Sequence, residues 1–196
     1  MGIDEMFDEN NRDQEQIYGV VIGIVTNNKD ERLLGRIQIR FPWRSEEQKK
    51  AYWARIGSLM AGKGRGTVFY PEVGDEVLVA FEHGDINHPY ILGTLWNGRD
   101  PPPEKNENGQ NNIRVIHSRS GHEIILDDTT GNEKIVLVDK TRQNKVTIDS
   151  AQNEIRIEAA IQIRITAPNI EIQGSESLTI GANGCIAIQG QIVKIN

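Results

Sequence analysis

The C-terminal part of the chain, residues 113 to 196, consists of short segments in which Ile, Val or Leu residues stand two positions apart. A spacing of two places these side chains on one face of a strand. Subtracting the numbers of neighbouring leading apolar residues gives steps of 11, 11, 9, 8, 7, 8 and 8 residues. Those leading residues are Ile124, Ile135, Val146, Ile155, Ile163, Ile170, Leu178 and Ile186. Repeats this short hold one strand each, so we expect an all-β region.

A strand with a narrow apolar stripe leaves both its edges and its stripe exposed when it stands alone. A single-chain β-helix needs roughly 20 residues per coil, so this region would give fewer than three coils and a poor core. The alternative of a second small sandwich conflicts with the absence of Phe, Tyr and Trp after Trp96. Three identical chains around one axis would bury the stripe and pair the edges. The pattern therefore favours a homotrimeric, triple-stranded intertwined β-helix over residues 113–196.

The second apolar residue of most segments extends the stripe that we expect to face the trimer axis. The predicted trimer core consists of Ile124, Leu126, Ile135, Leu137, Val146, Ile148, Ile155, Ile157, Ile163, Ile165, Ile170, Ile172, Leu178, Ile180, Ile186 and Ile188.

Residues 17–97 have the pattern of a small β domain. Ile37, Ile39 and Phe41 alternate with polar residues, which is typical of a half-buried strand. About five short strands separated by Gly, Asn and Asp turns predict a barrel of the OB type. The apolar runs proposed as strands are Tyr18–Val25, Ile37–Phe41, Thr67–Tyr70, Val77–Phe81 and Tyr90–Trp96.

Two polar segments flank this domain. Residues 1–16 read as an acidic N-terminal tail without the features of a signal peptide, and residues 98–112, with three consecutive prolines, read as a linker. We expect folding in the bacterial cytoplasm without a disulfide, because Cys185 is the single cysteine. The net charge of −6 argues against nucleic acid as the main partner.

Several motifs resemble reactive sites but fit structural roles better. Residues 57–64, GSLMAGKG, lack the Ser or Thr that a P-loop places after its lysine, so we expect a basic hairpin loop around Lys63. The four histidines have no metal-ligand spacing, and the aspartates Asp127, Asp128 and Asp139 are expected to cap turns. Residues 46–52 could form one helical turn. The prediction is no enzyme, with no catalytic, cofactor-binding or metal site.

Four motifs of the N-terminal half resemble the OB domain of the VgrG and phage baseplate assembly protein V spike family. They are residues 34–43 (LGRIQIRFPW), 52–55 (YWAR), 61–66 (AGKGRG) and 71–98 (PEVGDEVLVAFEHGDINHPYILGTLWNG). Residues 113–196 match only as a class, since the family also carries a triple-stranded β-helix there. The resemblance implies a structural spike at the centre of a contractile injection system or phage-like baseplate, driven through a target envelope when the sheath contracts.

The departures from the family pattern carry further expectations. Only about 16 residues precede the barrel where VgrG proteins have a hub domain, so the hub is expected to be a separate chain among the other baseplate components. The linker has no room for the lysozyme domain that some phage spikes insert. No histidine follows His122, so the metal site found at some spike tips is not expected. We expect a PAAR-type tip protein to bind instead, at Ile192, Val193, Ile195 and Asn196.

Two other functions stay open at this point. An OB barrel also suits a nucleic-acid-binding protein, and a β-helix also suits an adhesive, carbohydrate-binding fibre tip.

If the chain is a spike, its contact with a target membrane would be transient, and the assembled particle could be released from the cell.

Overall fold

The computed structural model describes residues 16–45 and 50–195, and divides the chain into two compact units, Met1–Glu107 and Asn108–Asn196. The expected N-terminal tail, apart from its last residue, lies outside the described residues, as do most of the expected helical turn and Asn196. Within the described part, no helix combines the length and the apolar character needed to cross a bilayer.

The first unit contains a closed barrel of five strands in the order β1-β2-β3-β7-β6. β3 and β7 run parallel, whereas the other neighbouring pairs are antiparallel. The strands are β1 (Val21–Asn27), β2 (Ile37–Arg40), β3 (Tyr52–Ile56), β6 (Glu76–Phe81) and β7 (Pro89–Leu95). This is the small closed all-β architecture of an OB fold, as predicted.

Alternating residues of these strands fill the barrel. Ile37, Ile39, Ala54, Val77 and Val79 are fully buried, and every second residue along their strands points outward. The ring of Phe41 lies 5.4–5.6 Å from those of Trp43, Tyr52 and Phe81. The barrel therefore encloses a complete core within one chain.

The third barrel strand is Tyr52–Ile56, and the sequence-based choice of Thr67–Tyr70 was wrong. Tyr52 and Ala54 face inward and alternate with Trp53 and Arg55, whereas Val68, Phe69 and Tyr70 are at least half exposed. The segment 67–70 is apolar at consecutive positions, so it has no single face to bury. Pro71 follows it and cannot donate a hydrogen bond to a neighbouring strand.

Two small elements also lie in the described part of the first unit. β4 (Ala61–Gly62) and β5 (Arg65–Gly66) form a short hairpin, and η3 (Glu82–Gly84) is a single 3-10 turn between β6 and β7. In the loop between β1 and β2, both carboxylate oxygens of Asp30 accept hydrogen bonds from the Arg36 guanidinium at 2.9 Å.

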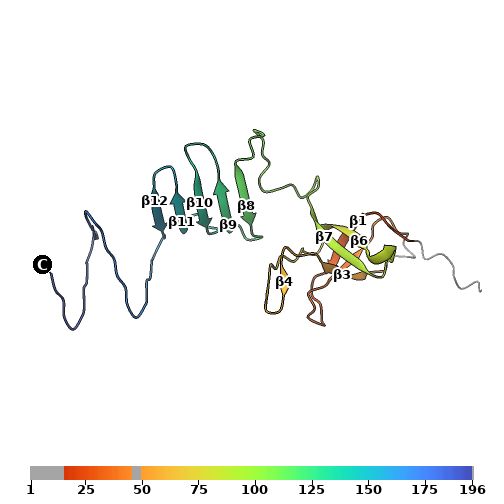
Figure 1. Ribbon diagram of the computed structural model, residues 1–196, viewed down its shortest axis with the longest axis horizontal. Helices are drawn as coiled ribbons and strands as arrows, with labels where there is room; N and C mark the ends of the chain where they lie inside the picture. The colour runs from red at the N-terminus through yellow and green to blue at the C-terminus, as the bar shows by residue number, and fades with distance from the viewer. Residues whose placement is uncertain (1–15, 46–49, 196) are drawn as a thin grey trace, which may run out of the picture. The chain divides into compact units, whose positions relative to one another are not determined.

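The second unit begins with an antiparallel five-stranded sheet in the order β12-β11-β10-β9-β8, so each strand pairs with the next along the chain. Figure 1 shows these strands side by side, followed by an open zigzag without strands. The strands are β8 (Ile113–His117), β9 (Glu123–Asp127), β10 (Lys134–Val138), β11 (Lys145–Asp149) and β12 (Glu154–Glu158). The sequence repeat thus corresponds to paired strands only up to β12.

Candidate assembly surface

One face of the five-stranded sheet is built almost entirely from the predicted stripe. The strand register places Ile116, Ile124, Leu137, Val146 and Ile157 in one row across the sheet. The neighbouring row on the same face contains Arg114, Leu126, Ile135, Ile148 and Ile155. The structure therefore brings together the first eight residues predicted for the trimer core.

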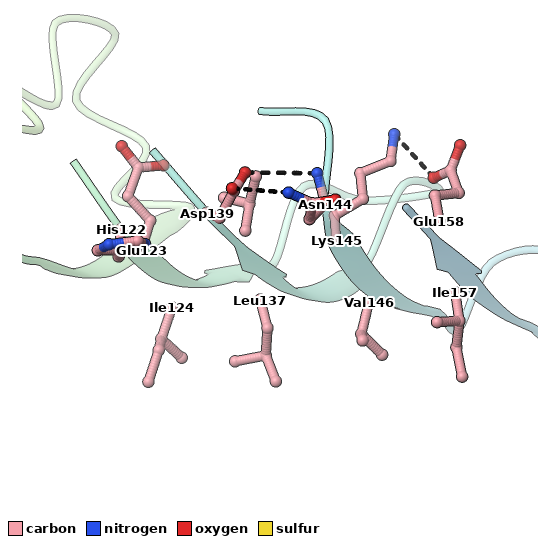
Figure 2. A pocket seen from close by; sticks show the side chains of 11 residues that line it. His122, Glu123, Ile124, Leu137, Asp139, Asn144, Lys145, Val146, Ile157 and Glu158 are labelled. Carbon is pink, nitrogen blue, oxygen red and sulfur yellow. Dashed lines mark hydrogen bonds and ion pairs between the residues drawn. The ribbon is translucent and has the colours of Figure 1, made fainter. Parts of the chain in front are cut away.

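These apolar side chains are open to solvent in the single chain. Relative exposure is 44% for Ile124, 46% for Leu137 and 70% for Ile155. Figure 2 shows Ile124, Leu137, Val146 and Ile157 in a row on one side of the ribbon, with Lys145 and Glu158 on the other. Monomeric soluble proteins rarely expose large continuous apolar patches, so a face of this kind marks an interaction site.

Several cross-strand polar contacts lie on the opposite face. Glu123, which is 9% exposed, accepts hydrogen bonds from both terminal nitrogens of Arg142 at 2.7 and 2.8 Å. His117 Nδ1 lies 3.2 Å from the same carboxylate, and Lys145 Nζ lies 2.9 Å from Glu158 Oε2 on the neighbouring strand. These groups have partners within the chain, so this face needs no second molecule to satisfy them.

The turns between the strands are fixed by aspartates, as predicted for Asp127 and Asp139. Asp139 accepts hydrogen bonds from the side chains of Asn144, at 2.8 Å, and Thr141, at 2.7 Å, and these lower its pKa to about 2. Asp127 accepts the backbone N–H of Thr129 at 3.0 Å, and hydrogen bonds from Thr129 lower its pKa as well. Figure 2 shows the Asp139–Asn144 bonds, and both residues line an open hollow of about 410 Å³. These carboxylates are held in turns.

Asp128 was also expected to cap a turn, but its carboxylate has a partner on another strand. Its carboxylate forms an ion pair with Arg114, and the two side chains are 62% and 52% exposed. This contact could not be predicted from the sequence, because 14 positions separate the two residues and the register of β8 with β9 brings them together.

The remaining stripe residues lie after β12, where the structure assigns no strand between residues 159 and 195. The predicted core residues here are at least half exposed, including Ile163 at 53%, Ile172 at 62% and Ile188 at 66%. Ile192 and Ile195, predicted to bind a tip protein, are 78% and 87% exposed. This part of the chain has neither a core nor strand pairing of its own.

The residues that resemble a P-loop form the β4–β5 hairpin. Ala61 pairs with Gly66 and Gly62 with Arg65, so Lys63 and Gly64 form the turn. Gly64 has a φ of +67°. A strand follows the lysine where nucleotide binding requires a helix N-terminus. The prediction of a basic hairpin is confirmed.

The histidines lie in polar turns and at strand ends. His88 Nδ1 pairs with Asp85 Oδ2 at 2.8 Å, and His122 Nδ1 accepts the backbone N–H of Lys140 at 3.3 Å. In residues 16–45 and 50–195, no group of three or more His, Cys, Asp or Glu side chains is placed to hold a metal ion.

A barrel with this strand order, followed by a sheet with an open apolar face, defines the chain as an OB-barrel protein with a C-terminal β extension. Residues 21–96 match the family model described as type VI secretion system/phage-baseplate injector OB domain. The barrel is therefore an injector OB domain of the kind found in VgrG and phage baseplate-V spike proteins.

Individual relatives support the same assignment. The chain is 29% identical to the type VI secretion system spike protein VgrG3 of Vibrio cholerae over 133 residues, covering 62% of this chain and 13% of the relative. Identity to VgrG1a of Pseudomonas aeruginosa is 27% over 150 residues, covering 69% of this chain and 23% of the relative. A similar relative is named actin cross-linking toxin VgrG1 of Vibrio cholerae, with 28% identity over 12% of its length.

The chain spans less than a quarter of the length of these relatives. A match over 69% of the chain nevertheless exceeds the first unit, which ends at residue 107 of 196, so the similarity continues into the second unit.

Proposed function

We propose that three copies of this chain form the central spike of a contractile injection system or phage-like baseplate, which pierces a target envelope when the sheath contracts. The observation that carries this proposal is the exposed apolar face of β8–β12 in a chain whose barrel belongs to the spike family. The role is structural and needs no catalytic residue. Hub and other baseplate components are the proposed neighbours in the assembled particle.

Three-fold symmetry suits the exposed face better than a simple pair. A two-fold contact would stack two sheets face to face but leave the outer strands unpaired. Rotation about a three-fold axis places three such faces inside a triangular prism and closes the assembly. The narrow interior of such a prism suits Ile, Leu and Val, which are the residues found at Ile124, Leu137 and Val146.

The segment 159–195 supports pairing between chains. Backbone N–H and C=O groups need partners when they are buried, and this segment has no strand partner within its own chain. The repeat step also shortens from 11 residues at Ile124 and Ile135 to about 8 after Ile155, where intrachain pairing ends. We propose that the three chains intertwine here as a triple-stranded β-helix.

The size of the assembly tests this proposal. Native mass spectrometry of the full chain should give three times the 22.0 kDa of one chain. Salt-dependent binding to DNA would favour the nucleic-acid alternative. That function usually requires a basic surface, whereas this chain has a net charge of −6. A monomer at micromolar concentration would overturn the trimer.

A second partner is proposed for residues 192–196. Three copies of Ile192, Val193 and Ile195, which are 49–87% exposed, would form an apolar surface at one level of the needle. We propose that a separate conical tip protein of the PAAR type covers it, one copy per trimer. Deleting residues 192–196 should abolish capture of the purified tip protein and leave the trimer mass intact. Unchanged capture would contradict this assignment.

A further inference from the structure

The apolar face of the sheet has a single polar interruption among its strand positions. Two positions on each of the five strands lie on this face, and nine of these ten are Ile, Leu or Val. The tenth is Arg114. It stands opposite Leu126, at the start of the row that continues through Ile135, Ile148 and Ile155.

Arg114 has a fixed partner at this place. Its guanidinium forms an ion pair with Asp128, the residue directly after β9. The backbone N–H of Asp128 donates to the carbonyl of Asn112 at 2.9 Å, which ties the position of Asp128 to the start of β8. Because β8 is an end strand of the sheet, the charged pair marks one end of the stripe.

The rest of the stripe specifies alignment poorly. Its rows consist of similar aliphatic side chains, so a neighbouring chain displaced by one strand would still place apolar residues against apolar residues. A polar group within an apolar interface resolves this ambiguity in coiled coils, where it fixes register and oligomeric state at a cost in stability. The ion pair of Arg114 and Asp128 is such a polar group, at the edge of the apolar face.

We propose that the Arg114–Asp128 pair sets the register of the three chains along the needle. The inference rests on the trimer proposed above. In the aligned trimer, three such pairs meet at the same level, where five guanidinium donors and two carboxylate oxygens per chain can bond to one another. In a displaced trimer, each pair is buried against Leu126 or Ile135 of a neighbour, and its remaining hydrogen bonds are unmet.

The decisive measurement is the distance between spin labels on the three chains. A nitroxide at Gln152→Cys, in the exposed β11–β12 turn and a Cys185→Ser background, gives one inter-label distance if the chains are aligned. The double variant Arg114→Met/Asp128→Leu should remain a trimer but show additional distances, because displaced chains differ by strand spacings of about 4.8 Å.

Two variants serve as controls. Lys145→Met/Glu158→Leu removes a cross-strand ion pair of 2.9 Å from the opposite face, and should keep the single distance. The exchange Arg114→Asp/Asp128→Arg keeps both charges on the apolar face, and should restore the single distance.

The outcomes separate this inference from the function on which it rests. A single unchanged distance in Arg114→Met/Asp128→Leu, or loss of its trimer, would overturn the role in register while the wild-type trimer stands. Additional distances in the Lys145→Met/Glu158→Leu control would overturn it too, because the effect would not depend on the apolar face. Absence of any inter-label distance in the otherwise wild-type chain would instead contradict the trimer itself.

Discussion

The barrel and the C-terminal unit both contain short strands with alternating apolar residues, but they differ in whether the chain itself covers those residues. In the barrel, β1 pairs with both β2 and β6, so no barrel strand is left without a neighbour, and Ile37, Val77 and Val79 are fully buried. In the second unit, nine Ile, Leu and Val residues of β8–β12 share one face that no other part of the described chain covers. The difference shows that alternation of apolar residues defines a buried face, whereas closure of the sheet decides whether one chain can bury it.

The largest effect is expected from a charge on the uncovered face. Ile148→Asp would place three carboxylates in the proposed interface, where an uncompensated buried charge costs about 3–5 kcal/mol per chain. The trimer should be lost, as measured by native mass spectrometry. Thr147→Asp, one residue away on the opposite face, is the matched control and should assemble normally. Equal assembly of both variants would show that the inward and outward faces are assigned wrongly.

The barrel should respond to loss of its own core without affecting assembly. Ile39→Ala removes a fully buried side chain, and such changes cost about 2–5 kcal/mol in unfolding free energy. All three tryptophans lie between Trp43 and Trp96, so their fluorescence follows the barrel alone during denaturation. The trimer mass should stay unchanged. A mutation that dissociated the trimer would show that the two units depend on each other.

A smaller effect is expected from acid on the β1–β2 loop. The Arg36 guanidinium and backbone N–H groups hold the pKa of Asp30 well below its ordinary value of 3.8. A carboxyl with a lowered folded-state pKa stabilises the fold above its unfolded-state pKa and loses that contribution as the pH falls through the folded value. The barrel of Asp30→Asn should therefore be less stable at pH 7 and lose less stability below pH ~4.

Tryptophan fluorescence at pH 7 and pH 3 checks this prediction. Asp100→Asn, which removes the partner of Arg99 at an exposed site, is the control and should resemble the wild type at both values. An identical acid response in Asp30→Asn and the wild type would exclude Asp30 as the source of the pH dependence.

The smallest effect is expected at the β4–β5 hairpin, which belongs to neither core. Lys63→Ala and Arg65→Ala change exposed side chains, and surface substitutions of this kind are usually within about 0.5 kcal/mol. Barrel unfolding and trimer mass should both be unaffected. A large loss of stability would place this hairpin in a contact that the single chain does not contain.

The sequence predicted features that depend on one strand at a time. Ile37–Phe41 was recognised because apolar and polar residues alternate strictly, and the first stripe residues were recognised because apolar residues recur two positions apart. Features that depend on register were missed. The sequence does not show which face of the sheet Arg114 lies on, because Ile113 and Val115 lie on one face of the strand and Ile116 lies on the other. The Glu123–Arg142 contact was missed because it joins residues 19 positions apart.

The simple up-and-down connection of β8–β12 has a consequence for how such proteins diverge. Each strand contacts only the strands before and after it in the chain, so an insertion or deletion of one repeat changes the structure locally. One additional repeat of 11 residues, the step between Ile124 and Ile135, would lengthen the sheet by about 4.8 Å and leave the barrel untouched. The length of the β extension is therefore a property that evolution, or a designer, can adjust in small increments by adding or removing repeats.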